Sequence, residues 1–379
     1  MRKIGVPGGS GMNETRIPLI PEQVVRLIQL GSEVAVESGL GKTVRLDDAE
    51  YEKAGARIQK DRKKLIEGSE ILLGIRKPDP KDIRHMAAGS VYAGMLDPFN
   101  EKGLITNLAK QGVSAISMEL IPRSTRAQKM DILSSQASLA GYVAVMLAAG
   151  RLDQIFPMMM TPAGTLKPSR VFVVGAGVAG LQAIATAKRL GARVEAFDTR
   201  PAVKEEVQSL GAKFIEIDLG ETGQTKDGYA KGLTEAQLKN QQEGMARICA
   251  HSDVIITTAQ VFGKTAPRII TREMIRGMTP GSVIVDMAVE TGGNVEGSKP
   301  DAEVEIDGVR IIGPVNPAGR VARHASQMIS SNLFNLISEF WDKEEKRFIL
   351  NVEDEIMRSA LVTHDGRIVN DMLSQHYAK

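Results

Sequence analysis

Cysteine and aromatic residues are scarce in this sequence, and their scarcity excludes several classes of protein. The chain of 379 residues has one cysteine, Cys249, and only 4% of its residues are aromatic. A single cysteine excludes a disulfide framework within the chain and is typical of a reducing compartment. The five histidines and the cysteine lack the spacings of metal sites, so we expect no bound metal.

Strong charge and long hydrophobic runs are also missing. The formal net charge is +2 and no basic tract is present, so we expect no nucleic-acid partner. The first residues, MRKIGVPGG, lack the apolar core of a signal peptide. The longest apolar run, near residues 143–149, is far shorter than the ~20 residues that cross a bilayer. We therefore expect a cytoplasmic chain without direct membrane insertion, or a soluble part of something larger.

The most informative stretch covers residues 169–200, SRVFVVGAGVAGLQAIATAKRLGARVEAFDTR. A short apolar run predicts a buried strand over residues 171–174, and the motif Gly-x-Gly-x-x-Gly follows at Gly175, Gly177 and Gly180. A helix is expected over residues 178–190 and a second strand over 193–197, with Asp198 at its end. This order predicts a dinucleotide-binding unit, and a glycine-rich turn without a ligand is the alternative.

Each part of this unit has a physical task. The first glycine permits a tight turn, the second lets backbone approach a pyrophosphate, and the third lets helix and strand pack closely. The N–H groups and the dipole at the start of the helix attract phosphate charge. Asp198 can accept hydrogen bonds from both ribose hydroxyls and would repel a 2′-phosphate, which predicts NAD(H) as the cofactor. Arg200, two residues later, weakens that preference.

Strands that alternate with helices predict an α/β fold for the whole chain. We expect two Rossmann-like domains with parallel sheets, joined by long helices and with a cleft between them. Residues 1–135, completed by 321–379, would form the N-terminal α/β domain, and residues 136–320 the NAD(H)-binding domain. The long helices are expected over residues 134–149 and 321–341. Further strands are expected over residues 3–6, 33–37, 70–75, 90–95, 113–118, 212–217, 254–258, 283–287, 310–312, 348–352 and 361–369, and helices over 21–30, 47–54, 100–111, 203–210 and 271–276.

Two segments are expected to be loops. Residues 151–167 include PMMMTPAGT, whose methionines we expect to pack rather than take part in chemistry. Residues 218–240 are polar and glycine-rich with one aromatic residue, Tyr229. Since long loops inside a domain are usually functional or disordered, we interpret this segment as a mobile lid over the nucleotide; an idle surface loop is the alternative. Thr258, Ala259 and Asn316 follow predicted strands, at the edge where open α/β sheets bind ligands.

Residues 118–142, MELIPRSTRAQKMDILSSQASLAGY, are polar where a connector could have been apolar. If the chain is helical from Gln128 onward, Gln128, Asp131 and Ser135 share one face. A carboxamide and a carboxylate beside arginine suit recognition of a nicotinamide carboxamide and its ribose. The alternative is that these side chains cap helices and pair at the domain junction.

Five segments together resemble the NAD(H)-binding component of proton-translocating nicotinamide nucleotide transhydrogenase: RAQKMDILSSQASLAGY, FPMMMTPAGT, VGAGVAGLQAIATAKRLGA, DGYAKGL and VNPAGR. The resemblance covers nearly the whole chain, and alanine dehydrogenase shares the architecture. It implies hydride transfer from NADH bound here to NADP(H) on a partner domain, coupled to proton movement through a membrane-spanning partner domain. It also implies a homodimer, peripheral on the cytoplasmic face of the inner membrane.

The resemblance further implies roles for individual residues. Arg123, Gln128, Asp131 and Ser134 would surround the nicotinamide and its ribose, and the first three would be the catalytic residues. Tyr229 would form the tip of the loop that closes over the nucleotide. The expected cofactor-binding residues are Arg123, Gln128, Asp131, Ser134, Gly175, Gly177, Val178, Ala179, Gly180, Asp198, Thr199, Arg200, Gly228, Tyr229, Thr258, Ala259 and Asn316.

Two other functions remain as alternatives. An NAD-dependent alanine dehydrogenase needs a proton acceptor and a cation for the substrate carboxylate. Alanine dehydrogenases carry a lysine at the position of Arg76, or of Lys77 if the register slips by one, and a histidine at that of Met95, which counts against alanine chemistry. A non-catalytic NAD(H)-binding regulator is disfavoured by the polar loop and the nicotinamide-side residues. The start, GVPGGSGMNETRIPLIPE, lacks the Lys-Glu pair usual in both families, a departure confined to the N-terminal domain.

Overall fold

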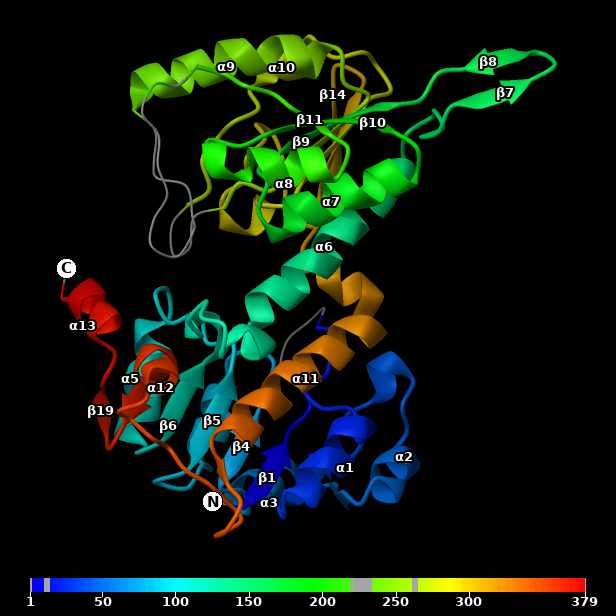
Figure 1. Cartoon of the computed structure of the whole chain (residues 1–379). Helices are drawn as coiled ribbons and strands as arrows, with labels where there is room; N and C mark the ends of the chain where they lie inside the picture. Colours follow the sequence, from blue (N-terminus) through cyan, green and yellow to red (C-terminus); the bar gives the residue numbers. More distant parts are fainter. Residues whose placement is uncertain (1, 10–13, 219, 221–233, 261–264, 379) are drawn as a thin grey trace. The chain divides into compact units, whose positions relative to one another are not determined.

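The computed structural model describes residues 2–9, 14–218, 220, 234–260 and 265–378. The chain forms two compact units, the first made of Met1–Gln136 with Gly319–Lys379 and the second of Ala137–Ala318. Figure 1 labels their helices and strands. The long helix α6 (Ile132–Ala149) begins in the first unit and ends in the second.

The first unit is built on an eight-stranded sheet with the order β19-β18-β6-β5-β4-β1-β2-β3. Its strands are β1 (Lys3–Val6), β2 (Glu33–Glu37), β3 (Arg57–Gln59), β4 (Ile71–Leu73), β5 (Val91–Gly94), β6 (Ser114–Ser117), β18 (Leu361–His364) and β19 (Arg367–Ile368). The six strands from the N-terminal part pair in parallel, and β18 adds antiparallel to β6. The C-terminal tail therefore completes the sheet that the first residues begin.

Helices cover both faces of this sheet. They are α1 (Pro21–Gln29), α2 (Asp48–Lys53), α3 (Arg62–Glu67), α4 (Pro80–Ile83), α5 (Lys102–Lys110), α11 (Ala322–Glu339), α12 (Glu355–Ala360) and α13 (Asp371–Tyr377). One core joins α1, α11 and α12 to residues of alternating positions in the strands, and a second joins α3, α4, α5 and α13 to the positions between. Strands buried on both faces explain their continuous apolar sequence. A small hairpin of β16 (Trp341–Asp342) and β17 (Arg347–Phe348) follows α11.

The second unit has a seven-stranded sheet with the order β11-β10-β9-β12-β13-β15-β14. Its strands are β9 (Arg170–Val174), β10 (Arg193–Phe197), β11 (Lys213–Phe214), β12 (Val254–Thr257), β13 (Val283–Asp286), β14 (Ala302–Ile306) and β15 (Val309–Gly313). All pairs are parallel except β14 with β15. The strand order reverses at β9, whose neighbours β10 and β12 lie on opposite sides.

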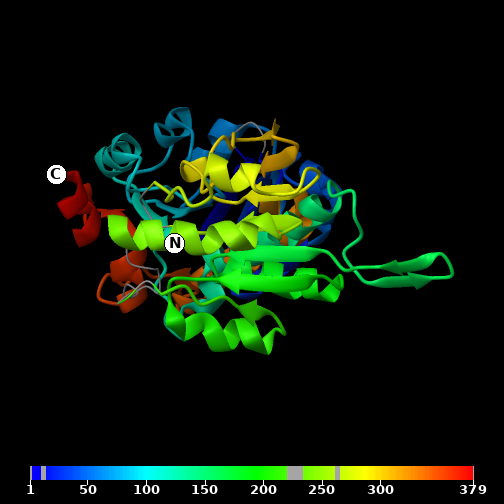
Figure 2. The same ribbon diagram turned by 90° about the horizontal axis from the view of Figure 1, so that it is seen from above.

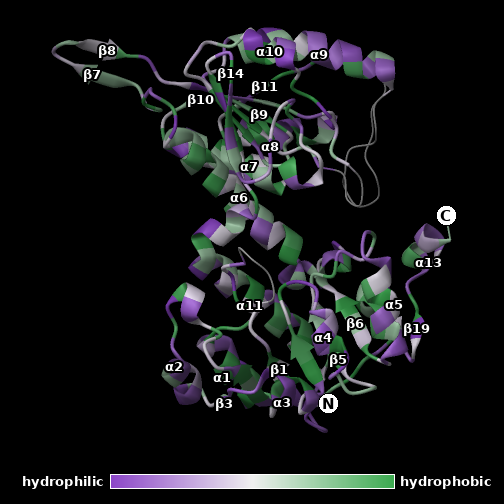
Figure 3. Cartoon of the chain, turned by 180° about the vertical axis from the view of Figure 1, so that it is seen from behind, coloured by the Kyte–Doolittle hydropathy of each residue, from purple (hydrophilic) through white to green (hydrophobic). Residues whose placement is uncertain are grey.

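Helices cover both faces of the second sheet as well. The helices α7 (Val178–Arg189) and α8 (Lys204–Ser209), with the second half of α6, pack on one face, and α9 (Glu235–Ala250) and α10 (Arg272–Arg276) on the other (Figure 1). Hydropathy colouring shows apolar strands inside and a largely hydrophilic α9 outside (Figure 3). The α/β class expected from the sequence, with two sheets that are mainly parallel, is confirmed.

The expectation of a loop over residues 151–167 was wrong. Strands β7 (Met159–Thr161) and β8 (Gly164–Leu166) form a hairpin that extends away from the rest of the second unit (Figure 2). Its methionines are exposed rather than packed: Met158 at 60%, Met159 at 45% and Met160 at 75%. The strands have three residues each and do not join the main sheet, so they leave no alternating pattern in the sequence.

The segment expected as a loop over residues 218–240 also differs where it is described. Thr234 caps α9 in a capping box with Gln237, so residues 235–240 are helical. Helices α9, α12 and α13 and strand β14 had no counterpart among the expected elements, and β11 is only two residues long. Polar and short elements of this kind have weak periodicity, because tertiary packing rather than pattern determines them.

Helix α6 has the length and composition of a membrane-crossing helix. Its 18 residues have a hydropathy of 1.5, and 44% of them are buried inside the structure. Among the described residues it is the one helix that meets this test. Core helices of water-soluble proteins meet it too, and Ala144, Val145 and Ala148 pack in the core of the second unit.

Candidate functional site

The glycine turn after β9 has a steric reason at its first and third positions. Gly175 has a φ of +97°, and a Cβ there would lie 2.6 Å from Thr258 Oγ1. A Cβ on Gly180 would lie 1.8 Å from the carbonyl oxygen of Gly175, which blocks any side chain. These contacts hold α7 against β9 and the end of β12. The two glycines are therefore required by the fold itself.

Gly177 differs, because a Cβ at this position would meet no atom within 4 Å and its φ is −81°. It is the N-cap of α7, and no side chain caps the first turn of that helix. The chain itself therefore gives no steric reason for glycine here. Open space beside N–H groups at a helix N-terminus fits a pyrophosphate that approaches the backbone closely. Val178, next in the chain, is 40% exposed, and Ala179 contacts α6, where a Cβ on Gly141 would lie 2.1 Å from its carbonyl oxygen.

Asp198 lies beside this turn, at the end of β10. Its Oδ2 accepts a hydrogen bond of 2.7 Å from the N–H of Ala176, inside the glycine motif. Its side chain is 6% exposed and forms an ion pair with Arg200, whose side chain is 16% exposed. Burial opposes the charge of Arg200, but its hydrogen bond to Asp198 has the larger effect and raises the pKa of the guanidinium. Sequence reasoning placed these residues together without this ion pair; Thr199 lies between them in the turn.

A buried polar cluster shapes the neighbouring strand end. Thr258 Oγ1 lies 3.1 Å from the carbonyl oxygen of Gly175. Asn294, fully buried, bonds both the N–H and the carbonyl of Ala259. Asp286 in turn accepts hydrogen bonds from the N–H groups of Ala288, Asn294 and Val295. Sequence reasoning missed Asn294, although the GGN that follows β13 was its only signal.

The glycine turn and the Thr258–Ala259 turn therefore lie side by side at the carboxyl ends of β9 and β12. This is the point where the strand order reverses, and open α/β sheets bind their ligands at such points. Asn316, after β15, has a left-handed φ of +45°, and its N–H donates to Glu290 at 3.2 Å. The second unit thus brings together its candidate residues around β9 and β12.

The polar segment of the first unit is not one continuous helix, so the predicted helical face was wrong. Gln128–Met130 form a 3₁₀ turn, and Asp131 has an extended ψ of 91° before α6 begins. Asp131 caps α6, because its oxygens accept from the N–H of Ser134 at 2.9 Å and its hydroxyl at 2.6 Å. Ser135 points elsewhere, to Asn332 of α11 at 2.8 Å.

Arg123 and Gln128 are exposed on the first unit. Arg126, between them, forms ion pairs with Glu339 and Asp354 and so belongs to the structure of the C-terminal tail. Gly228 and Tyr229 lie outside the described residues. The assignment of these residues to the nicotinamide stays a prediction.

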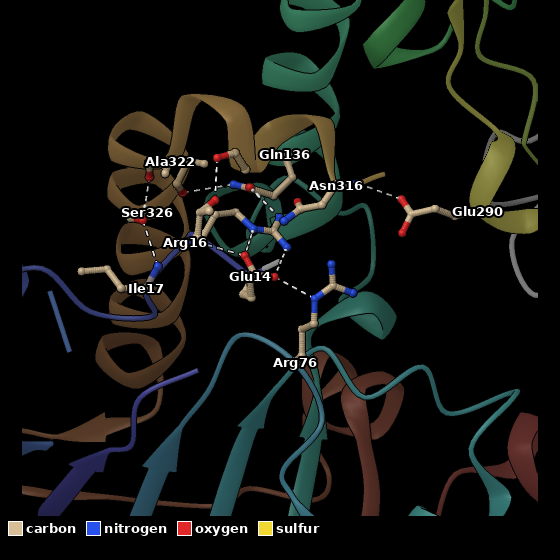
Figure 4. A network of polar contacts seen from close by, with 12 residues as sticks. Glu14, Arg16, Ile17, Arg76, Gln136, Glu290, Asn316, Ala322 and Ser326 are labelled. Carbon is tan, nitrogen blue, oxygen red and sulfur yellow. Dashed lines mark hydrogen bonds and ion pairs between the residues drawn. The ribbon is translucent and has the colours of Figure 1, made fainter. Parts of the chain in front are cut away.

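A buried polar network lies at the carboxyl ends of strands in the first unit. Glu14 lies between Arg16 and Arg76, and Arg16 also donates to Gln136 at 3.0 Å (Figure 4). Burial by itself would raise the pKa of Glu14, but the hydrogen bonds and charges of Arg16 and Arg76 outweigh it and lower the pKa to about 2. Arg76, the candidate cation for a substrate carboxylate, is thus paired with a carboxylate of the chain.

The other candidates for alanine chemistry are similarly engaged. Lys77 forms an ion pair with Glu101, and Met95 packs against the core of the first unit. Cys249 is buried, which raises the pKa of its thiol to about 12 and disfavours a thiolate at neutral pH. Among the residues that the structure describes, no three His, Cys, Asp or Glu side chains gather as a metal site requires.

Comparison with known proteins places the chain in a family. The N-terminal domain model of the alanine dehydrogenase/PNT family matches residues 5–140, and its C-terminal domain model matches residues 144–371. This chain belongs to that family. An NAD(P) transhydrogenase subunit alpha protein of Rhodospirillum rubrum is 42% identical over 379 residues, which cover 98% of this chain and 99% of that protein.

Solved structures and a further member agree with this placement. A crystal structure of transhydrogenase from Sinorhizobium meliloti has a TM-score of 0.87 and 43% identity, and the match covers 97% of this chain and 100% of that one. The alanine dehydrogenase of Halomonas elongata is 28% identical over 373 residues, which cover 97% of this chain and 94% of that protein. The resemblance to transhydrogenase that the sequence motifs indicated is confirmed.

Proposed function

We propose that this chain is the NAD(H)-binding component of a proton-translocating NAD(P) transhydrogenase. One observation carries the proposal: identity to transhydrogenase proteins is 42–43% over nearly the whole chain, against 28% to an alanine dehydrogenase. The second unit offers a site of the right kind, because Gly177 leaves space for a pyrophosphate and Asp198 stands where a ribose would bind.

The nicotinamide of bound NADH supplies the hydride in this reaction. The N–H groups at Gly177, Val178 and Ala179 hold the pyrophosphate, and Asp198 holds the adenosine ribose. Arg123, Gln128, Asp131 and Ser134 place the nicotinamide and its ribose. Because hydride passes directly between two nicotinamides, these residues orient the ring and exclude water rather than act as acid or base.

The acceptor in the proposal is NADP(H) bound on a separate partner domain. Proton translocation belongs to a membrane-spanning partner domain, and this chain sits peripherally on the cytoplasmic face of the inner membrane. We further propose a homodimer. The exposed methionines of the hairpin β7–β8, with Leu166 at 51% exposure, support a second copy that covers them, since contiguous exposed apolar residues are typical of contact surfaces.

The alternative, an NAD-dependent alanine dehydrogenase, needs a free cation for the substrate carboxylate. The pairing of Arg76 with Glu14 and of Lys77 with Glu101, and Met95 in place of a histidine, argue against it.

Hydride-transfer assays separate the two functions. The purified chain is mixed with NADH and an NADP analogue, with and without an NADP-binding transhydrogenase domain, and separately with pyruvate and ammonia. Rapid transfer only in the presence of that domain is the expected result. Oxidation of NADH with pyruvate and ammonia by the chain alone would overturn the proposal in favour of alanine dehydrogenase. No transfer with any partner, despite NADH binding, would instead point to a regulator.

A further inference from the structure

The Asp198 carboxylate is completely hydrogen-bonded within the chain. Its Oδ1 accepts from the N–H of Arg200 at 2.8 Å and from Arg200 Nε at 2.9 Å. Its Oδ2 accepts from Arg200 Nη2 at 2.8 Å and from the N–H of Ala176 at 2.7 Å. An ionised carboxylate offers about four acceptor positions, and all are used. None is left for the two hydroxyls of a ribose.

The four donors differ in how easily they can leave. The N–H groups of Ala176 and Arg200 belong to the backbone of two turns and stay in place while those turns keep their form. The guanidinium is at the end of a long side chain and can move away by rotation about its own bonds. Two ribose hydroxyls therefore have one way to reach Asp198, which is to replace the two hydrogen bonds of that guanidinium.

We propose that Arg200 is an internal competitor for the adenosine ribose, so that NAD(H) binds Asp198 only when the guanidinium leaves it. This inference rests on the proposed function, because it assumes that Asp198 reads the ribose. The exchange conserves the number of hydrogen bonds but breaks a nearly buried ion pair, so Arg200 lowers the affinity for NADH. A weakly held nucleotide is released readily between turnovers.

Arg200 also affects the discrimination between NADH and NADPH. Asp198 alone would present a negative charge to a 2′-phosphate, whereas its pair with Arg200 is neutral. A displaced guanidinium is in addition a good partner for a phosphate, with which it forms bidentate hydrogen bonds. Removal of Arg200 should therefore raise the preference for NADH over NADPH from both sides.

The test compares Arg200→Met with Lys204→Met by calorimetric titration of NADH and NADPH. Methionine keeps the length of the stem without a donor. Lys204 is a matched control, because it lies nearby, pairs with Glu216 at 2.5 Å and loses the same charge without contact to Asp198. Arg200→Met should bind NADH about three- to tenfold more tightly than Lys204→Met, which should resemble the wild type. Its preference for NADH over NADPH should also rise.

Thermal unfolding gives a second readout. Arg200→Met leaves a buried carboxylate without its cation, so its melting temperature should fall without ligand and rise further than that of the wild type when NADH is added. Arg200→Lys, which keeps the charge but cannot form the bidentate pair, should lie between the two and preserves the test if the methionine variant is unstable. NADH binding by Arg200→Met or Arg200→Lys that is no tighter than that of the control overturns the inference alone. A wild-type chain that does not bind NADH overturns the proposed function, and this inference with it.

Discussion

Replacement of Glu14 by glutamine should destabilise the first unit by about 3 kcal/mol at neutral pH. The Glu14 side chain is 3% exposed and accepts from Arg16 Nε and Nη2, each at 2.8 Å, and from Arg76 Nε at 2.7 Å. These contacts lower its pKa from 4.5 to about 2, a difference that corresponds to about 3 kcal/mol of stability when the group is ionised. Arg16, 5% exposed, would lose its counter-charge in the variant.

The sign of the pH dependence follows from the direction of the shift. Because the folded pKa lies below the unfolded one, the stabilisation is complete above about pH 5 and is lost as the pH falls toward 2. The difference in free energy of unfolding between wild type and Glu14→Gln should therefore shrink from about 3 kcal/mol at pH 7 to about 2 kcal/mol at pH 3.5.

Urea unfolding followed by tryptophan fluorescence measures this difference. The single tryptophan, Trp341, is buried in the first unit, so its emission reports that unit. Glu353→Gln is the matched control, because this carboxylate is 84% exposed and its pair with Arg358 should contribute less than about 0.5 kcal/mol. A Glu14→Gln variant as stable as the control at pH 7, or equally destabilised at both pH values, would refute the reasoning.

Three further predictions concern the nucleotide site and the hairpin. Gly177→Ala should fold with unchanged stability yet lose NADH affinity by tenfold or more, or about 1.4 kcal/mol, whereas Gly180→Ala should lower the melting temperature itself; circular dichroism and calorimetry would show both, and equal NADH binding by Gly177→Ala would exclude a pyrophosphate at that position. Asp198→Asn should weaken NADH binding by about 1–3 kcal/mol, and an unchanged dissociation constant would show that another residue reads the ribose. Met160→Glu should shift a dimer toward monomer in sedimentation experiments, because it places a charge in an apolar contact, and an unchanged mass would remove the hairpin from the interface.

The βαβ unit around the glycine motif could be predicted because its signals are local. The strand β9, the three glycines and the helix α7 follow rules that involve only near neighbours in sequence, and each lies where expected. The hairpin β7–β8 was missed because three-residue strands leave no periodicity. Helix α9 was missed because its sequence is mostly polar, and only the capping box at Thr234 indicates where it starts.

The candidate site was predictable in part for the same reason. Sequence spacing placed Asp198 beside the glycine turn, but it could not reveal that Arg200 satisfies the carboxylate, because that depends on side-chain conformation. Asn294 is remote in sequence from the turn that it holds. The helical face proposed through Gln128 and Asp131 failed because the backbone at Asp131 is extended, a feature that residue identity alone does not specify.

The path of the chain gives the first unit an unusual order of assembly. During synthesis its parallel strands emerge first, yet the edge of its sheet at β6 stays open until β18 arrives more than 240 residues later. The second unit, which lies wholly between these two pieces, is complete before its neighbour can be. A nascent or truncated chain that lacks the last strands therefore presents an unpaired strand edge, the kind of surface on which chains aggregate.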